Sequence, residues 1–419
     1  MSLISRIAAD RWTAAIGAVC GVLIVAVMLV DAPTGAFRYL VDLDVYRLGA
    51  TEFLRSGDIY NQRYLTQEAP LPFTYPPFAA LVFSPLAYLP LPVGSIIFTA
   101  VTLICLVVSC AVALAWCAVP HPLVWALRAA PLVMLCEPVI ATLMFGQINT
   151  VLLLLVLVDA SGVLRKKLPW WPPGVLCGIA AAIKLTPAIF IVYFLLNAEW
   201  KAARNFVLSA LIASALPALM YPQLVWQYFS HTIFSTDRIG ASHFAANQSI
   251  AGVISRAEIP AGWWLPLSIV AIAGGGYSAY RAIRSNQPLL ALSVVALIGL
   301  LASPISWSHH WVWLPLTSYA LWRAGARIMA GWVLFAATIG CFHAFLPSRN
   351  HVELEWSVVQ QILGSHYVIV AGAVLVWCAY RLRTNYAASQ RQGTPIPTTA
   401  EYLAADHTPT RSGPADPHQ

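Results

Sequence analysis

Carboxylates able to act on a substrate gather in one early stretch of the chain, residues 41–77. This stretch contains five of them, and Asp42 and Asp44 open an expected helix. A carboxylate placed beside a substrate hydroxyl can remove its proton as a general base. Asp is also common in the first turn of a helix, where it caps free N–H groups and meets the positive end of the dipole. The residue types alone leave both roles open.

Helical periodicity favours Asp42 over Asp44 as the base. At about 100° per residue, Asp42, Tyr46 and Phe53 lie on one stripe of the expected helix. Asp44 falls on the opposite face, which it shares with the charged Arg55. We therefore expect the Asp42 stripe to face the protein and its cavity, and we keep Asp44 as the alternative base.

Lys184 is the second candidate, because it stands at the centre of the apolar segment 173–197. An ammonium group in such a segment is costly unless it faces water, an anion or a carboxylate. Pro187 follows three residues later, so we expect the chain to break here into two half-helices. The prediction for Lys184 is anion binding or an ion pair, for which Glu137 in another apolar segment is a candidate partner.

Other polar residues stand where apolar segments are expected to begin or end. Each has an ordinary structural role available, such as capping, interhelical hydrogen bonding or anchoring at the membrane interface. Two adjacent histidines framed by tryptophans are suited to a phosphate or a zwitterionic head group, but neighbours on a helix point about 100° apart and are poorly placed for one metal ion. The candidate binding residues are Tyr75, Gln147, Asn149, Asn247, Gln248, His309 and His310.

Composition sets the protein class. Of the 419 residues, 59% are hydrophobic and 10% are charged, against about 25% charged in a soluble domain. Repeated apolar runs predict an all-α polytopic membrane domain over residues 1–383, with about 11–13 membrane segments. A polar, proline-containing sequence from 384 to 419 is expected to be a disordered cytoplasmic tail.

Partners and cofactors are restricted by the same composition. The net charge of +7 comes from basic residues at segment ends, which fits cytoplasmic loops and not a nucleic-acid surface. All eight cysteines lie in or beside apolar stretches, without the spacing of a zinc site, so we read them as small core residues. We expect no metal and no cofactor.

Basic residues also predict the topology. The run 165–167 marks a cytoplasmic turn in a plasma-membrane protein. Counting segments from it places the carboxylate stretch, the turn at 147–149, the loop 221–261 and the turn 303–310 on the extracytoplasmic side. The segment 77–91 is short and interrupted by prolines, so a kinked span and a re-entrant piece both stay open.

Six motifs, in this order, resemble those of glycosyltransferase family 87, a family of polytopic enzymes in the GT-C superfamily. The resemblance covers nearly the whole membrane domain. The motifs are DLDVYRLGA (42–50), FTYPPFAALVFSPLA (73–87), FGQIN (145–149), IKLTP (183–187), NQSIAGVISR (247–256) and SPISWSHHWVW (303–313).

The resemblance implies an inverting α-(1→2)-mannosyltransferase with its active site in extracytoplasmic loops. The donor would be polyprenyl-phosphate-mannose, and the acceptor a glycolipid or lipoglycan such as a phosphatidylinositol mannoside, lipomannan or lipoarabinomannan. It also implies that a carboxylate of the DLxVY-type motif is the catalytic base and that a histidine of the SHHW-type motif acts at the donor phosphate. In this chain the first of these motifs contains two aspartates.

Three alternatives stay open at this point. One is a GT-C enzyme that uses another polyprenyl-phosphate sugar. Another is a secondary transporter, in which polar residues lie at broken helices near the midplane of the membrane. Against it, the sequence has no internal repeat and its carboxylates cluster in one loop. A non-enzymatic scaffold would leave Lys184 and the two histidines without a role.

Overall fold

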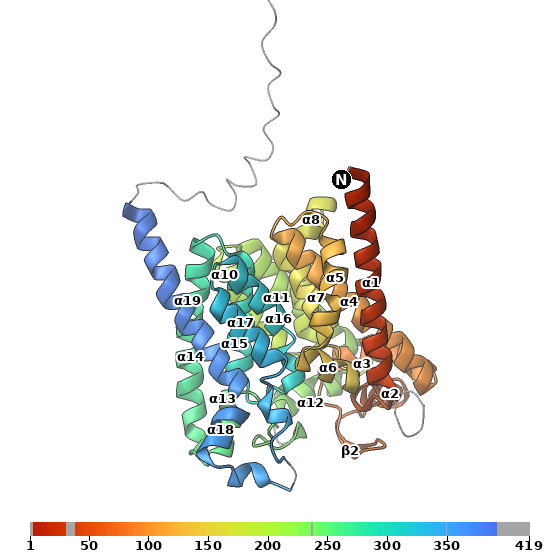
Figure 1. Cartoon of the computed structure of the whole chain (residues 1–419). Coiled ribbons are helices and arrows are strands. Elements are labelled where there is room, and N and C mark those ends of the chain that lie inside the picture. Colours follow the sequence, from red (N-terminus) through yellow and green to blue (C-terminus); the bar gives the residue numbers. More distant parts are fainter. Residues whose placement is uncertain (1–2, 31–37, 236–237, 349, 392–419) are drawn as a thin grey trace, which may run out of the picture.

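The structure, a computed structural model, describes residues 3–30, 38–235, 238–348 and 350–391 (Figure 1). Nearly all of its elements are helices. The N-terminal part contains α1 (Leu3–Leu29), α2 (Val41–Arg55), β1 (Tyr64–Leu65), β2 (Pro70–Leu71), α3 (Pro77–Phe83), the 3-10 helix η1 (Ser84–Tyr88) and α4 (Leu91–Trp116). The two strands pair antiparallel, with Tyr64 opposite Leu71.

The remaining elements continue the helical pattern to the end of the described residues. The middle part contains α5 (Pro122–Met134), α6 (Glu137–Phe145), α7 (Asn149–Ser161), α8 (Val163–Lys167), α9 (Val175–Ile183), η2 (Thr186–Phe190), α10 (Ile191–Leu196), α11 (Trp200–Ala215), η3 (Leu216–Leu219), α12 (Pro222–Ser230) and η4 (Thr232–Phe234). The last part contains α13 (Ile250–Arg256), η6 (Ala261–Trp263), α14 (Trp264–Arg284), α15 (Pro288–Ala302), η7 (Ser308–Trp311), α16 (Leu314–Arg323), α17 (Arg327–Ala337), η8 (Phe342–Ala344), η9 (Val352–Glu355), α18 (Val358–Gly364) and α19 (His366–Arg391).

Several of these helices are long and apolar enough to cross a membrane. Three described segments meet that test, Leu91–Trp116, Trp200–Leu219 and Arg327–Ala344, and the number rises to five if each of two bent helix pairs is one span. Shorter apolar helices accompany them. The predicted all-α polytopic membrane fold is confirmed, while the total of 11–13 membrane segments stays a prediction.

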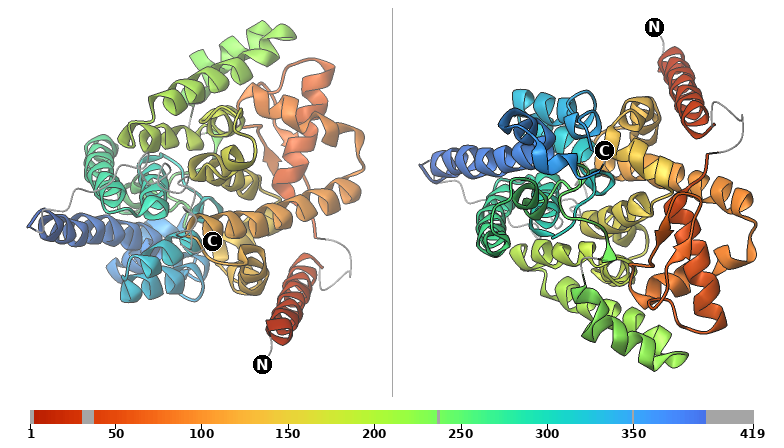
Figure 2. Two further views of the ribbon diagram at one scale, coloured as in Figure 1. Left: turned by 90° about the horizontal axis from the view of Figure 1, so that it is seen from above. Right: turned by 90° about the horizontal axis from the view of Figure 1, so that it is seen from below.

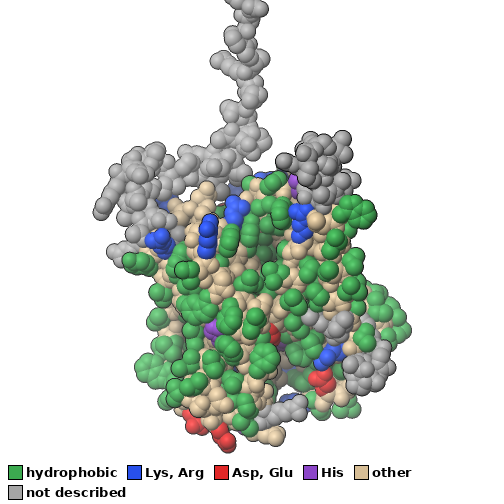
Figure 3. Space-filling view, in the orientation of Figure 1, with side chains coloured by type: hydrophobic (Ala, Val, Ile, Leu, Met, Phe, Trp, Pro, Cys, Tyr) green, Lys and Arg blue, Asp and Glu red, His purple; other side chains and the backbone are tan. Residues whose placement is uncertain are grey.

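The helices form one bundle with chemically different ends. Seen along its axis, α1 stands at the rim of the bundle (Figure 2). The basic helix α8 lies at the upper end of Figure 1, whereas α2, β2, α12 and α18 lie at the lower end. A row of Lys and Arg side chains marks the upper end, and the Asp and Glu side chains on this face lie in the lower half (Figure 3).

Helix α2 is held in the bundle by the stripe that periodicity predicted. Tyr46 and Phe53 are buried. The Tyr46 ring stacks on Phe83 of α3, with centroids 4.3 Å apart and an interplanar angle of 5°. Gly49 lets Phe73 pack closely against α2, because a Cβ there would lie 2.3 Å from the Phe73 ring. The burial of the stripe is therefore confirmed for Tyr46 and Phe53, whereas Asp42 at its start is only partly buried and Asp44 is buried.

The predicted break at Lys184 is also confirmed. Helix α9 ends at Ile183, and Lys184 adopts an extended conformation with φ −144° and ψ 134°. The 3-10 helix η2 then begins at Thr186, with Pro187 in its first turn. The chain thus leaves the α-helical path at Lys184 itself, which frees its side chain from a helix face.

The chain is interrupted within two further apolar segments. Helices α5 and α6 meet at an angle of 83°. Pro138, at the start of α6, has no N–H to donate into the preceding turn, so the helix cannot run through. Segment 77–91 forms the short α3 and η1, below the ~20 residues that a spanning helix needs. This favours the re-entrant piece over the kinked span.

The tail expected from residue 384 lies mostly outside the described residues. Helix α19 continues past the expected start of the tail to Arg391. Residues 392–419 are not among those that the structure describes.

Candidate active site

Asp42 lies in the first turn of α2 and faces the middle of the bundle. Its Oδ2 atom accepts a hydrogen bond of 2.6 Å from Nε2 of Gln147, which follows α6. Burial raises the pKa of Asp42 to about 6, although the bond from Gln147 and the positive charge of Lys184 act in the opposite direction. A carboxylate with this pKa is ionised at neutral pH and basic enough to take a proton.

The Gln147 amide is oriented by two tyrosines. Its Oε1 lies 3.1 Å from the Tyr46 hydroxyl and 3.0 Å from the Tyr75 hydroxyl. The two hydroxyls lie 2.7 Å apart and share a hydrogen bond. Because hydroxyl donors face the carbonyl side of the amide, the NH₂ side must face Asp42.

Gly146 brings this amide against α2. It ends α6 in the left-handed region, with φ +70° and ψ 45°. A Cβ at this position would lie 2.8 Å from the Cβ of Leu43. A glycine therefore satisfies both the turn and the close approach of the two helices.

Lys184 supplies the positive charge of the site. Its Nζ donates to Oδ1 of Asn149 at 3.0 Å and lies 3.0 Å from Nε2 of His310. It also lies 5.2 Å from the centroid of the Tyr75 ring, in a cation–π arrangement. The break after α9, the start of α7 and η7 thus meet at one ammonium group.

The two histidines take different positions, as their adjacency predicted. His310 reaches Lys184, and its Nδ1 has no protein partner within the described chain. When Nε2 accepts from the Lys184 ammonium, Nδ1 carries the ring proton and is free to donate to a ligand. His309 instead packs edge-on against Phe145, with centroids 5.6 Å apart, and its Nε2 has no described partner either.

Asp44 does not join this cluster. Its Oδ2 accepts from the Tyr39 hydroxyl at 2.7 Å, and its Oδ1 accepts from Nε of Arg47 at 3.0 Å. Periodicity placed Asp44 on the charged face of α2, yet its side chain is buried because these two residues cover it. The contacts that hold Asp44 are those of a structural ion pair.

Asn247 and Gln248 lie beneath the site and do not line it. Both are fully buried. Asn247 accepts from the backbone N–H of Ser306 at 2.9 Å, and Gln248 donates its backbone N–H to the Ser306 carbonyl at 2.8 Å. They hold the segment that leads into η7, and in this way they support the two histidines without contacting the site.

Glu137 is not the partner of Lys184. Its carboxylate accepts hydrogen bonds from Ser308 and Tyr367 instead, each at 2.7 Å. The bend between α5 and α6 turns the start of α6 toward η7 and α19, away from α9. The sequence identified Glu137 as a charged residue in an apolar segment, but it did not show which side chains contact it.

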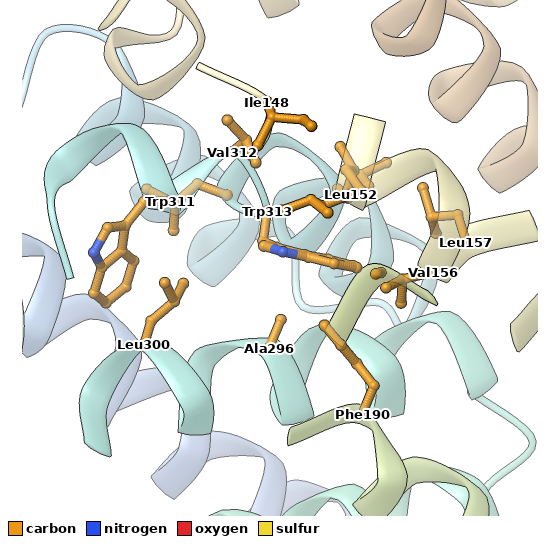
Figure 4. Close-up of a cluster of buried hydrophobic side chains, with 14 of the residues drawn as sticks. Ile148, Leu152, Val156, Leu157, Phe190, Ala296, Leu300, Trp311, Val312 and Trp313 are labelled. Carbon is orange, nitrogen blue, oxygen red and sulfur yellow. The ribbon is translucent and has the colours of Figure 1, made fainter. Parts of the chain in front are cut away.

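An apolar pocket opens beside the polar cluster. Asn149 and His310 are polar residues of its wall, and the rest comes mostly from α7, η2, α15 and the residues between η7 and α16. Trp313 is part of this wall, with its ring centroid 5.0 Å from that of Phe190, and both belong to the cluster of buried hydrophobic side chains in Figure 4. The pocket is therefore mainly apolar, and two residues of its wall, Asn149 and His310, contact Lys184.

Sequence reasoning missed two residues that complete this geometry. Tyr46 was identified only as part of the buried stripe, although its position one helical turn after Asp42 was a signal that the two share a face. Thr142, whose hydroxyl donates to the His309 carbonyl at 3.1 Å, carried no signal because its partner is far along the chain.

Comparison with known proteins supports a common architecture. The family model described as Glycosyltransferase family 87 matches residues 73–304. A "Polyprenol-phosphate-mannose-dependent alpha-(1-2)-phosphatidylinositol mannoside mannosyltransferase" of Mycobacterium tuberculosis is 35% identical over 87% of this chain and 91% of its own. The protein of the same name from Mycolicibacterium smegmatis is 37% identical over 82% of this chain and 84% of its own.

A further relative carries a related name. A "Polyprenol-phosphate-mannose-dependent alpha-(1-2)-phosphatidylinositol pentamannoside mannosyltransferase" of Mycobacterium tuberculosis is 36% identical over 83% of this chain and 82% of its own. No solved structure matches. The matched range includes Tyr75, Gln147, Asn149 and Lys184, and the chain is a member of glycosyltransferase family 87.

Proposed function

We propose that this protein transfers mannose from polyprenyl-phosphate-mannose to a phosphatidylinositol mannoside, forming an α-(1→2) linkage with inversion. The observation that carries the proposal is the pairing of a carboxylate, Asp42, with a cationic cluster, Lys184 and His310, across the Tyr75 and Gln147 side chains. The names of the relatives support the donor and the acceptor. Lipomannan, lipoarabinomannan and another polyprenyl-phosphate sugar are the remaining variants of this proposal.

The reaction divides between the two sides of the cluster. Asp42 takes the proton from the acceptor hydroxyl while the oxygen of that hydroxyl forms a bond to the anomeric carbon of the donor. The bond from that carbon to the phosphate oxygen breaks, and the electron pair leaves with polyprenyl phosphate. Attack opposite the leaving group converts a β-linked donor to an α-linked product.

The cationic side stabilises the leaving group. The donor phosphodiester carries one negative charge, and the released phosphate gains a second. Lys184 and the free Nδ1–H of His310 are the donors that face this charge. The adjoining pocket, lined by Leu152, Phe190 and Trp313 among others, suits the start of the polyprenyl chain.

The same arrangement supports an active site on the extracytoplasmic face of the plasma membrane. Helix α2, with Asp42, lies at the end of the bundle opposite the basic α8 (Figure 1). Basic loops favour the cytoplasm. A transporter would place such residues at a substrate path between repeats, and the matched relatives are named as transferases instead.

Asp42→Asn is expected to lower kcat by at least ~10²-fold, because the amide cannot take the acceptor proton. Asp44→Asn is expected to retain most activity, since Asp44 contacts Tyr39 and Arg47 and not the cluster. Transfer of radiolabelled mannose by the purified protein measures both. An inactive Asp44→Asn beside an active Asp42→Asn would assign the base to the other carboxylate.

The rate is expected to fall as the pH drops through about 6, because Asp42 must be unprotonated and burial raises its pKa to that value. The Gln147 hydrogen bond lowers this pKa. Gln147→Met removes the bond, so its acidic limb should move to higher pH. A pH profile of kcat/KM measures the shift. An unchanged limb in Gln147→Met would contradict the role of Asp42 as the titrating base.

Lys184→Met keeps the length of the side chain and removes its charge. We expect a loss of at least ~10-fold in kcat/KM for the donor, the lower end of what one charge-assisted hydrogen bond to a phosphate contributes. Donor kinetics in detergent, with size-exclusion elution as the check on folding, provide the measurement. Donor kinetics like those of the wild type would leave Lys184 a structural partner of Asn149.

Topology is tested by cysteine labelling. Leu65, in β1, is 82% exposed, and Lys166, in α8, is also exposed. In a background with Cys20 replaced, because Cys20 is exposed, we expect Leu65→Cys to react with an impermeant thiol reagent in intact cells. Lys166→Cys should react only after permeabilisation. The reverse pattern would place the site on the cytoplasmic face.

A further inference from the structure

Glu137 is a largely buried carboxylate outside the proposed site, with 16% of its side chain exposed. It opens α6, and its two oxygens accept from different elements. Oε1 accepts from the Ser308 hydroxyl in η7, and Oε2 accepts from the Tyr367 hydroxyl in α19, both at 2.7 Å. Nε2 of His343 in η8 lies 3.7 Å from Oε1. One carboxylate therefore joins four segments that are far apart in the sequence.

The bond to Ser308 reaches the residue immediately before the two histidines. Ser308 is 5% exposed, so this bond is closed to solvent. The next residue is held too, because the His309 carbonyl accepts from Thr142 at 3.1 Å and from Asn149 at 2.8 Å. Helices α6 and α7 thus fix η7 at two successive residues, and His310 follows in contact with Lys184.

The chemistry of this position requires an acceptor on both sides. An ionised carboxylate has two acceptor oxygens, and it accepts from both hydroxyls at once. An amide of the same shape has one acceptor oxygen, so its NH₂ group would donate to one of the hydroxyls and leave the proton of that hydroxyl without its present acceptor. A charge in an apolar setting is costly unless it is hydrogen-bonded in this way. Of these contacts, the bond from Ser308 is the one that reaches the histidine turn.

We propose that Glu137 is a positioning residue for the donor site. Through Ser308 it fixes η7, so that His310 stays within reach of Lys184 and of the donor phosphate. This inference rests on the proposed function for the identity of the ligand. It assigns Glu137 no contact with substrate, and it predicts an effect on donor binding larger than the effect on the chemical step.

Ser308→Ala is the primary test, because it removes the link to η7 and leaves the Tyr367 bond intact. We expect KM for polyprenyl-phosphate-mannose to rise about 10-fold, the effect of losing one charge-assisted hydrogen bond, with kcat changed less. Glu137→Gln should shift KM in the same direction. The double variant should be no worse than the more severe single variant, because both changes break the same link.

Ser278→Ala is the matched control. Ser278 is fully buried in α14 and donates to the carbonyls of Gly274 and Leu375, at 2.9 Å in each case. Its loss should lower Tm without changing the donor KM. If Ser308→Ala lowers Tm as Ser278→Ala does and keeps the KM of the wild type, Glu137 is structural only and the inference is overturned.

A binding measurement separates this inference from the proposed function. Titration of the purified protein with polyprenyl phosphate, followed by tryptophan fluorescence, gives Kd without sugar transfer. Absence of mannose transfer by the wild type would refute the proposed function alone. Weaker binding of polyprenyl phosphate by Ser308→Ala and Glu137→Gln would still support the positioning role, and equal Kd values for all three proteins would refute it.

Discussion

The site depends on how one ammonium group, Lys184, is accommodated in an apolar bundle. Its charge is costly there unless polar groups surround it. The structure meets this requirement with the side-chain oxygen Oδ1 of Asn149, a ring nitrogen of His310 and the face of the Tyr75 ring. Each partner comes from a different segment. Satisfying one cation therefore brings together the break after α9, the start of α7, the FTYPP stretch and η7.

The opposite side of the site is organised around a carboxylate, Asp42, which must be hydrogen-bonded without being neutralised by a fixed positive partner. Asp42 must stay accessible to a hydroxyl group and still avoid a permanent ion pair, which would hold its pKa low. A neutral donor, the Gln147 amide, meets both conditions at 2.6 Å. Asp44 shows the contrast, because Arg47, three residues further along the same helix, pairs with it. The neighbours of each carboxylate, and not its type, separate the candidate base from the structural ion pair.

A second layer of polar contacts supports the histidines without lining the site. Asn247 and Gln248 bind the backbone at Ser306, and Glu137 binds the side chain of Ser308. A 3-10 turn of four residues has few hydrogen bonds of its own to keep its shape. Its geometry therefore has to be set by helices that pack around it.

The sequence by itself determined the membrane class, the buried stripe of α2 and the break at Lys184, because apolar periodicity, helix geometry and proline act within a few residues. The motifs also indicated the family. Only the tertiary structure decided that Asp44 is covered by Tyr39 and Arg47, and that Glu137 meets Ser308 in place of Lys184. The Glu137 contact depends on the 83° bend between α5 and α6 and joins residues more than 100 positions apart. Tyr39 and Arg47 lie within five positions of Asp44, but the direction of their side chains is set in the folded chain. No local pattern records which distant side chain will face a buried charge.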